Sequence, residues 1–168
     1  MARAHFVKKA QKDHKAGGIK KGESYWWWAF MQGGRGGPKH YSKTQPRRSQ
    51  LTQSAFYGPQ YDIEDRISDL SLVDGPDLAG ERDNIADDIR ALGEEQQEKL
   101  DNMPDSLKEG PTGETLQSRA DGCEEWASEL EQVDCDDLEQ NKGESDEDYE
   151  GRVDDARAAL QDCQYSGE

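Results

Sequence analysis

Hydrophobic and polar positions follow two different rhythms along this chain, a period of two near its start and a helical period further on. Residues 24–31 give the strongest strand signal, because consecutive aromatic side chains fit a pleated surface and would crowd a helix. Alternation assigns their side chains to two faces. One face receives Tyr25, Trp27, Ala29 and Met31, and the other receives Trp26, Trp28 and Phe30.

Two shorter segments complete the expected sheet. Residues 3–9 are predicted to form a strand, followed by a polar loop rich in Lys and Gly at 10–22. The glycine-rich run at 33–38 suits a hairpin connection, and residues 39–43 would form the returning strand. The result is a three-stranded antiparallel meander. Since both faces of its middle strand carry large aromatic side chains, we expect one face to be covered and the other to serve for binding.

The remainder predicts helices over about 61–73, 77–103, 112–140 and 146–164, after a polar connector at 44–60 from which Phe56 and Tyr57 can fold back onto the sheet. Apolar positions recur at spacings of four and three, which is coiled-coil-like periodicity. The positions in this spacing are Ile63, Ile67 and Leu70; Ile85, Ile89, Leu92, Gln96, Lys99 and Met103; Leu116, Ala120, Cys123, Ala127 and Leu130; and Tyr149, Val153, Ala156, Leu160 and Cys163. The apolar ones among them are predicted to form the core. These stripes are narrow, so we expect a helical hairpin or small bundle that also allows homo-oligomers.

The fold class predicted is therefore α+β, with a small three-stranded antiparallel sheet followed by acidic α-helices. Charge divides the chain at the same place. Residues 1–60 hold twelve Lys and Arg against two acids, a net charge of +10, whereas residues 61–168 carry −26, which together make −16. Halophilic adaptation would acidify the whole surface, so it does not explain a basic start. We expect two parts, a basic aromatic-rich β module at 1–60 and an acidic helical region at 61–168.

Composition and motifs argue against several classes of protein. Only 32% of the residues are hydrophobic and 35% are charged, so the cores are small. The run Gly33-Gly34-Arg35-Gly36-Gly37 lacks the ending of a phosphate-binding P-loop and matches no dinucleotide-binding fingerprint; a hairpin turn or an arginine-tipped loop touching phosphate remain open. No stretch approaches the ~20 apolar residues of a membrane span, and no apolar segment follows the charged N-terminus as in a signal peptide.

Candidate catalytic and metal-binding groups are also poorly placed. The three histidines lie in the basic part and the three cysteines in the acidic part, without metal-ligand spacing. These residues are His5, His14 and His40, and Cys123, Cys135 and Cys163. No nucleophile motif is present. We therefore expect reduced thiols, no cofactor, no metal and no enzymatic activity.

Nucleic-acid binding is the function that the basic module favours. Lys and Arg neutralise phosphates, and unpaired bases stack on aromatic rings. Ten of the thirteen Phe, Trp and Tyr residues fall within the first 61, interleaved with cations, although some must form the module's own core. The candidate phosphate contacts are Lys8, Lys9, Lys20, Lys21, Arg35, Lys39, Lys43, Arg47 and Arg48, and the candidate stacking residues are Trp26, Trp28 and Tyr41. The partner would be nucleic acid or a nucleoprotein complex, with the acidic helices recruiting a host protein or preventing indiscriminate association.

Four other interpretations stay open. The acidic helices can imitate a phosphate backbone and inhibit a host nucleic-acid-binding protein, with one row formed by Asp83, Asp87, Asp88, Glu94, Glu95 and Glu98. They can simply keep the chain soluble. Finally, the helices can assemble a structural protein, or the basic module can dock on an acidic helix of the same or a neighbouring chain.

Three segments of the module are distinctive: Lys20-Lys21-Gly22-Glu23-Ser24-Tyr25-Trp26-Trp27, Tyr41-Ser42-Lys43-Thr44 and Pro46-Arg47-Arg48-Ser49-Gln50-Leu51-Thr52-Gln53-Ser54. Together they resemble a group of uncharacterised bacteriophage proteins. The resemblance covers roughly the first 65 residues. It implies a protein made inside an infected bacterium, and therefore a cytoplasmic location, but it implies no activity and no site residues.

Overall fold

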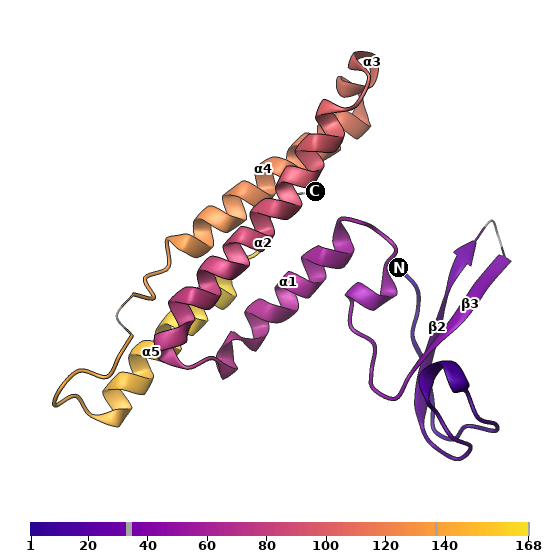
Figure 1. The fold of residues 1–168 in the computed structure, drawn as a ribbon, viewed down its shortest axis with the longest axis horizontal. Coiled ribbons are helices and arrows are strands. Elements are labelled where there is room, and N and C mark those ends of the chain that lie inside the picture. The colour runs from indigo at the N-terminus through magenta and orange to yellow at the C-terminus, as the bar shows by residue number, and fades with distance from the viewer. Residues whose placement is uncertain (33–34, 137, 168) are drawn as a thin grey trace. The chain divides into compact units, whose positions relative to one another are not determined.

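The computed structural model describes residues 1–32, 35–136 and 138–167, and it has the α+β layout predicted from the sequence (Figure 1). Residues form two compact units, Met1–Asp62 and Ile63–Glu168, which we call the sheet unit and the helical unit. The sequence analysis placed the boundary at residue 60.

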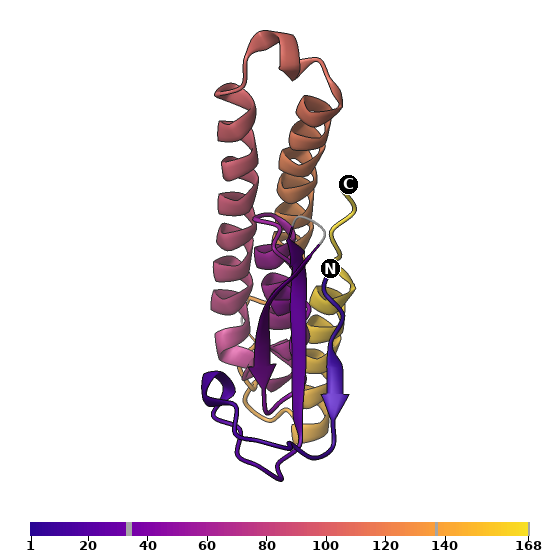
Figure 2. The same ribbon diagram turned by 90° about the vertical axis from the view of Figure 1, so that its right-hand side faces the viewer.

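The sheet unit contains a three-stranded antiparallel sheet in the order β1-β2-β3, as expected. Its strands are β1 His5–Val7, β2 Tyr25–Gln32 and β3 Arg35–Ser42. Figure 2 shows the three strands side by side, with the β1–β2 loop and the β2–β3 connection at opposite ends of β2. The aromatic strand β2 is central, so both neighbours contribute side chains to each of its faces.

The returning strand is longer than predicted. It begins at Arg35 rather than residue 39, so most of the glycine-rich run, with Pro38, belongs to the sheet. The register shifts between Ala29 and Met31, which leaves one extra residue on β3. Pro38 is compatible with this position because β3 is an edge strand. Gly33 and Gly34 of the predicted hairpin lie outside the described residues.

Helix α1 (Tyr57–Asp69) begins four residues earlier than predicted, and its last turn continues into the 3-10 helix η3 (Leu70–Leu72). Sequence analysis assigned Gly58-Pro59 to the connector, but proline is favoured in the first turn of a helix, where its missing N–H costs nothing. The Ser54 hydroxyl accepts the Tyr57 N–H at 3.2 Å and stabilises this end of the helix. Phe56, just before the helix, is 2% exposed.

Two long antiparallel helices dominate the helical unit (Figure 1). They are α2 (Gly75–Asp101) and α4 (Pro111–Glu131), joined by the short helix α3 (Asp105–Lys108) and followed by α5 (Asp146–Asp162). Close packing of α2 against α4 depends on Gly93, because a Cβ there would lie 2.9 Å from the Cβ of Cys123. Among the described residues, none of the helices combines the length and the apolar character needed to cross a bilayer.

The four-and-three spacing identified most of the helical core. Buried predicted positions include Ile85, Ile89, Gln96, Cys123 and Leu130. Other positions of this spacing are not buried: Lys99 is exposed, and Met103, Ala120, Tyr149 and Cys163 are half-buried. Leu100, next to Lys99, is buried instead. Trp126, which the spacing left out, is 1% exposed, and its indole N–H donates to the Cys163 carbonyl at 3.2 Å.

Helix α4 ends at Glu131, nine residues before the predicted end. Arg82 of α2 donates to the carbonyl of Val133 at 2.9 Å and so satisfies a group that no longer bonds within the helix. The chain then buries Cys135 and Leu138, which are 1% and 7% exposed. Burial of these two side chains outside the helix explains why the helical pattern stops early.

Candidate nucleic-acid interface

The register of the sheet decides which of the predicted stacking residues share a face. Trp26 pairs with Ser42 and Trp28 with His40, whereas Trp27 pairs with Tyr41. Side chains of directly paired residues point to the same face of a sheet. Tyr41 therefore lies on the face opposite Trp26 and Trp28, and the three residues do not form one stacking surface.

Trp28 is a core residue, which corrects its assignment as a stacking residue. It is 6% exposed, and the imidazole of His40 stacks on it with 5.5 Å between ring centroids and 16° between planes. Within the described chain, its buried indole N–H has no hydrogen-bond partner, so packing alone holds the ring. A base would have to displace this packing before it reached the indole.

Trp26 and Tyr41 are half-buried and already contact other rings. Phe6 lies against Trp26 at a centroid distance of 5.1 Å. On the other face, His14 stacks on Tyr41 at 4.5 Å, close to the buried Tyr25. These aromatic residues pack on the two faces of the sheet and form its small cores. The sequence analysis predicted that some of them form the module's own core.

Cations are concentrated in the connection between β1 and β2, residues 8–21, which we call the lysine loop. Six lysines lie in it, and all six are exposed: Lys8, Lys9, Lys12, Lys15, Lys20 and Lys21. In the part of the chain that the structure describes, no ion pair engages any of these six ammonium groups. The loop therefore offers uncompensated positive charge.

The lysine loop is anchored along its length. At its base, Ala10 N–H donates to the Glu23 carbonyl at 2.8 Å and Gly22 N–H donates to the Ala10 carbonyl at 2.9 Å. Nearer the tip, His14 and Ile19 form an isolated antiparallel bridge. Ala10 and Ile19 are each 2% exposed and pack with Tyr25. The loop was predicted as a loop, but nothing in its composition indicated these attachments.

Both acids of the sheet unit's first 60 residues help to fix this loop. An Asp13 carboxylate oxygen accepts the Lys21 N–H at 2.7 Å, and a Glu23 carboxylate oxygen accepts the Lys20 N–H at 2.7 Å. The Glu23 pKa lies below its ordinary value because of this backbone hydrogen bond and, next, because Lys43 donates to it. Both carboxylates therefore hold the loop in place as acceptors.

The other predicted phosphate contacts are more dispersed. Lys39 lies over the Trp27 ring, with 4.3 Å from its nitrogen to the centroid. Lys43 is paired with Glu23 at 3.1 Å. Arg47 and Arg48 are exposed just before the 3-10 helix η2 (Ser49–Leu51), and the guanidinium of Arg48 lies 4.0 Å from the Tyr61 ring centroid. The side chain of Arg35 lies outside what the structure describes.

Sequence reasoning missed four residues of this surface. Lys12 and Lys15 belong to the lysine loop, at its tip, and their density in a polar segment was an available signal. Trp27 and His5 were also missed, although His5 is exposed and stacks on Trp27 at 4.5 Å. Cross-strand pairing sets that contact, and pairing register is not readable from one strand alone.

Glu23 limits the positive charge of this surface, so its replacement should strengthen anion binding. Its lowered pKa keeps the carboxylate ionised at neutral pH, where it compensates Lys43. Glu23→Gln removes the charge but retains an oxygen that can accept the Lys20 N–H. We expect nucleic-acid affinity to rise about threefold to fivefold at low salt and the salt dependence to steepen by roughly one contact. Fluorescence anisotropy over a salt series measures both; an unchanged or lower affinity would contradict this expectation.

The acidic residues on α2 form two rows instead of one. Asp83, Asp87, Glu94 and Glu98 recur at spacings of four, seven and four, so they share one exposed face. Asp88 and Glu95 lie on a second stripe, where Asp88 pairs with Arg66 of α1 and Glu95 with Lys99. Intramolecular ion pairs thus compensate part of the acidity.

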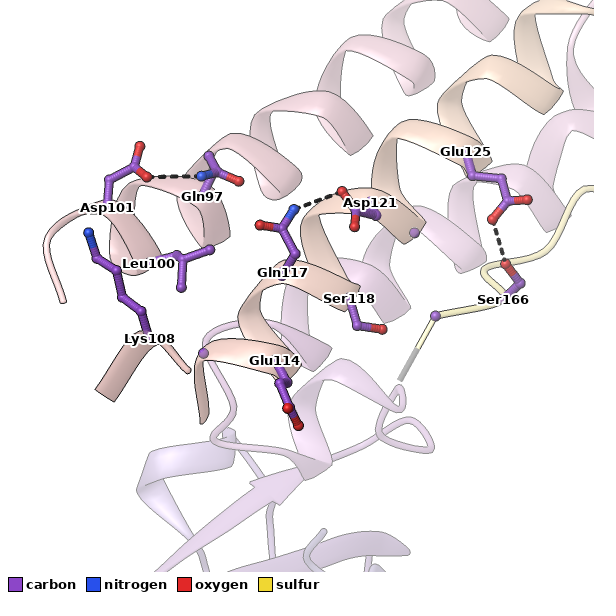
Figure 3. A pocket seen from close by; sticks show the side chains of 13 residues that line it. Gln97, Leu100, Asp101, Lys108, Glu114, Gln117, Ser118, Asp121, Glu125 and Ser166 are labelled. Carbon is purple, nitrogen blue, oxygen red and sulfur yellow. Dashed lines mark hydrogen bonds between the residues drawn. The ribbon is translucent and has the colours of Figure 1, made fainter. Parts of the chain in front are cut away.

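An open groove on the helical unit lies between α2, α3, α4 and the residues after α5 (Figure 3). Three of the carboxylates that line it accept hydrogen bonds from neighbours: Gln97 donates to Asp101 at 2.9 Å, Gln117 to Asp121 at 2.8 Å and Ser166 to Glu125 at 3.4 Å. No histidine or cysteine is among the described residues that line it. The groove provides no argument for a particular reaction, and the absence of enzymatic activity stays a prediction.

The cysteines are free thiols, as far as the described residues show. Burial raises the pKa of Cys123 to about 11, and burial is also the main cause that raises the pKa values of Cys135 and Cys163. Thiols of this kind are protonated at neutral pH and react slowly. No group of three potential metal ligands occurs among the described residues.

No protein-family model, no curated protein and no solved structure matches this chain.

Proposed function

We propose that the chain is a non-enzymatic protein that binds nucleic acid, or a nucleoprotein complex, through its sheet unit. The observation that carries the proposal is the lysine loop, where six exposed and unpaired ammonium groups lie on an anchored segment. The resemblance to bacteriophage proteins adds the expectation that the chain acts in the cytoplasm of an infected bacterium.

The physical basis is the release of counterions from a polyanion. Each lysine that neutralises a phosphate frees condensed cations, so affinity falls steeply with salt. Anchoring matters because a loop fixed before binding loses less conformational entropy when its charges meet phosphates. Because the six lysines are exposed, phosphates can reach their ammonium groups without a rearrangement of the fold.

The helical unit supplies the second half of the proposed function. This unit carries most of the 37 acidic residues. Its negative charge repels polyanions that do not contact the sheet unit. Such repulsion lowers indiscriminate association with nucleic acid. The same carboxylates offer a host protein a surface for recruitment.

A specific observation favours one alternative, in which the helical unit mimics nucleic acid. Asp83 and Asp87 share an exposed face of α2 with Glu94 and Glu98. Residues four apart on a helix are separated by about 6 Å, which is close to the spacing of phosphates along a strand. A chain acting this way would occupy the cationic groove of a host protein.

The test is binding of the full chain to labelled DNA and RNA, single- and double-stranded, over a salt series, with anionic lipid vesicles in parallel. Binding to nucleic acid with a steep salt slope, and weaker binding to vesicles, is the result we expect. Absence of nucleic-acid binding at low salt overturns the proposal. Capture of a host nucleic-acid-binding protein that nucleic acid then displaces would establish mimicry instead.

A further inference from the structure

The aromatic rings of the sheet unit are engaged with one another and with neighbouring side chains. Trp27 is contacted from both neighbouring strands, by His5 of β1 at 4.5 Å and by Lys39 of β3 at 4.3 Å. The His5 imidazole lies nearly parallel to the indole, at 15°. Side chains from both neighbouring strands therefore cover the indole of Trp27.

The other face of the sheet repeats this arrangement. His40 covers Trp28, and Phe30 packs edge-on against the same imidazole at 5.7 Å. Phe6, which is 51% exposed, lies against Trp26. All three histidines of the chain stack on or tilt against aromatic rings of the sheet unit. The surfaces in these contacts are not available for stacking with a base.

The lysine loop lies against the sheet instead of projecting from it. Its 3-10 helix η1 (Lys15–Gly17) approaches β3 so closely that a Cβ on Gly17 would be 2.7 Å from the Cβ of Tyr41. His14, one residue before η1, stacks on the same tyrosine. The backbone of the lysine loop is therefore held against the sheet, and the loop covers one of the rings predicted to stack on bases.

From these observations, which rest on the proposed function, we infer that the ligand is an intact double helix bound through its phosphates. Proteins that hold single strands combine cations with free aromatic faces on which unpaired bases stack. Here the six ammonium groups of the lysine loop have no ion-pair partner among the described residues, whereas the sheet's rings are engaged by neighbouring side chains. A double helix keeps its bases stacked internally and presents two lines of phosphates, which exposed lysines on an anchored backbone can contact without any base stacking on a ring.

This inference predicts little dependence on base sequence. Lysine is a point charge on a flexible stem and lacks the planar fork with which arginine reads guanine. Duplex DNA and duplex RNA share the recognised chemistry, two antiparallel strands of phosphate. Comparison of the two duplexes identifies the natural source.

The experiment compares the full chain's affinity for short duplexes of DNA and RNA with its affinity for the separate strands, at one salt concentration. We expect at least one duplex to bind about tenfold or more tightly than its single strands, with similar affinity for unrelated base sequences. Intrinsic tryptophan emission should change little on saturation, since no base stacks on an indole. The variants Trp26→Leu and Phe6→Leu should bind the duplex within about twofold of the parent chain.

Each outcome decides the matter. Single strands that bind as tightly as both duplexes, quench tryptophan emission and lose affinity in Trp26→Leu would overturn the duplex inference while leaving the proposed function intact. Absence of binding to every nucleic acid would overturn both. A circular-dichroism spectrum of each variant, compared with the parent, separates lost contacts from lost folding.

Discussion

Replacing Lys12, Lys15 and Lys21 together with glutamine should lower nucleic-acid affinity by about 100-fold at low salt and flatten the salt dependence by about 2.7 in log–log slope, or 0.9 for each lost phosphate contact. All three side chains are exposed and unpaired among the described residues, so their removal breaks no ion pair of the fold. The Lys21 N–H that Asp13 accepts is a backbone group and persists in the variant. Anisotropy titrations from about 50 to about 200 mM salt give both quantities.

The helical unit provides a control of equal charge. It contains three lysines, Lys99, Lys108 and Lys142, and their replacement by glutamine changes net charge by the same amount. Lys99 and Lys108 lie in exposed pairs on their own helices, which contribute little to stability. We expect this variant to bind like the parent chain, or slightly more weakly. Equal losses in both variants would mean that overall charge, rather than the lysine loop, governs binding.

Trp28→Ala should unfold the sheet unit. The indole is almost fully buried, and removal of such a side chain costs about 3–5 kcal/mol of the free energy of unfolding. A unit of this size has a small core and little stability in reserve. Near-ultraviolet circular dichroism should fall to the part contributed by the helical unit, and the dispersed NMR signals of the sheet residues should be lost, while the far-ultraviolet helical signal largely remains.

Trp26→Ala is the matched control for this prediction. Trp26 lies two residues away on the same face, is half-buried and packs mainly against Phe6. We expect a smaller loss of about 1–2 kcal/mol and a folded sheet. If both variants kept the sheet equally well, Trp28 would not be a core residue in solution. Its original assignment as a stacking residue would then regain support.

Much of the fold was predictable because two periodicities decide it. Alternation along β2 assigned its side chains to the correct faces, and spacings of four and three located Ile85, Ile89 and Leu130 in the helical core. Errors occurred where side chains from distant segments determine the outcome. Helix α4 ends where Arg82 and the burial of Cys135 redirect the chain, and no local pattern records either event.

The candidate site was only partly predictable for a related reason. Charge density pointed to the basic module, but it could not distinguish exposed rings from covered ones. His40 covers Trp28 through cross-strand pairing, and His14 covers Tyr41 through the docking of a loop. Backbone hydrogen bonds at Ala10 also shape the lysine loop, and backbone groups leave no mark on composition.

The hydrogen bonds of Asp13 and Glu23 limit how much positive charge the surface around the lysine loop can carry. Exchange of either residue for lysine would add charge, yet it would delete the acceptor that restrains a neighbouring amide. At these two sites, a substitution that strengthens the attraction to polyphosphates thus weakens the restraint on the loop. Substitution by the neutral amides asparagine and glutamine removes the negative charge and keeps an acceptor oxygen. The negative charges of Asp13 and Glu23 thus accompany the acceptors that hold the backbone on which six lysines are exposed.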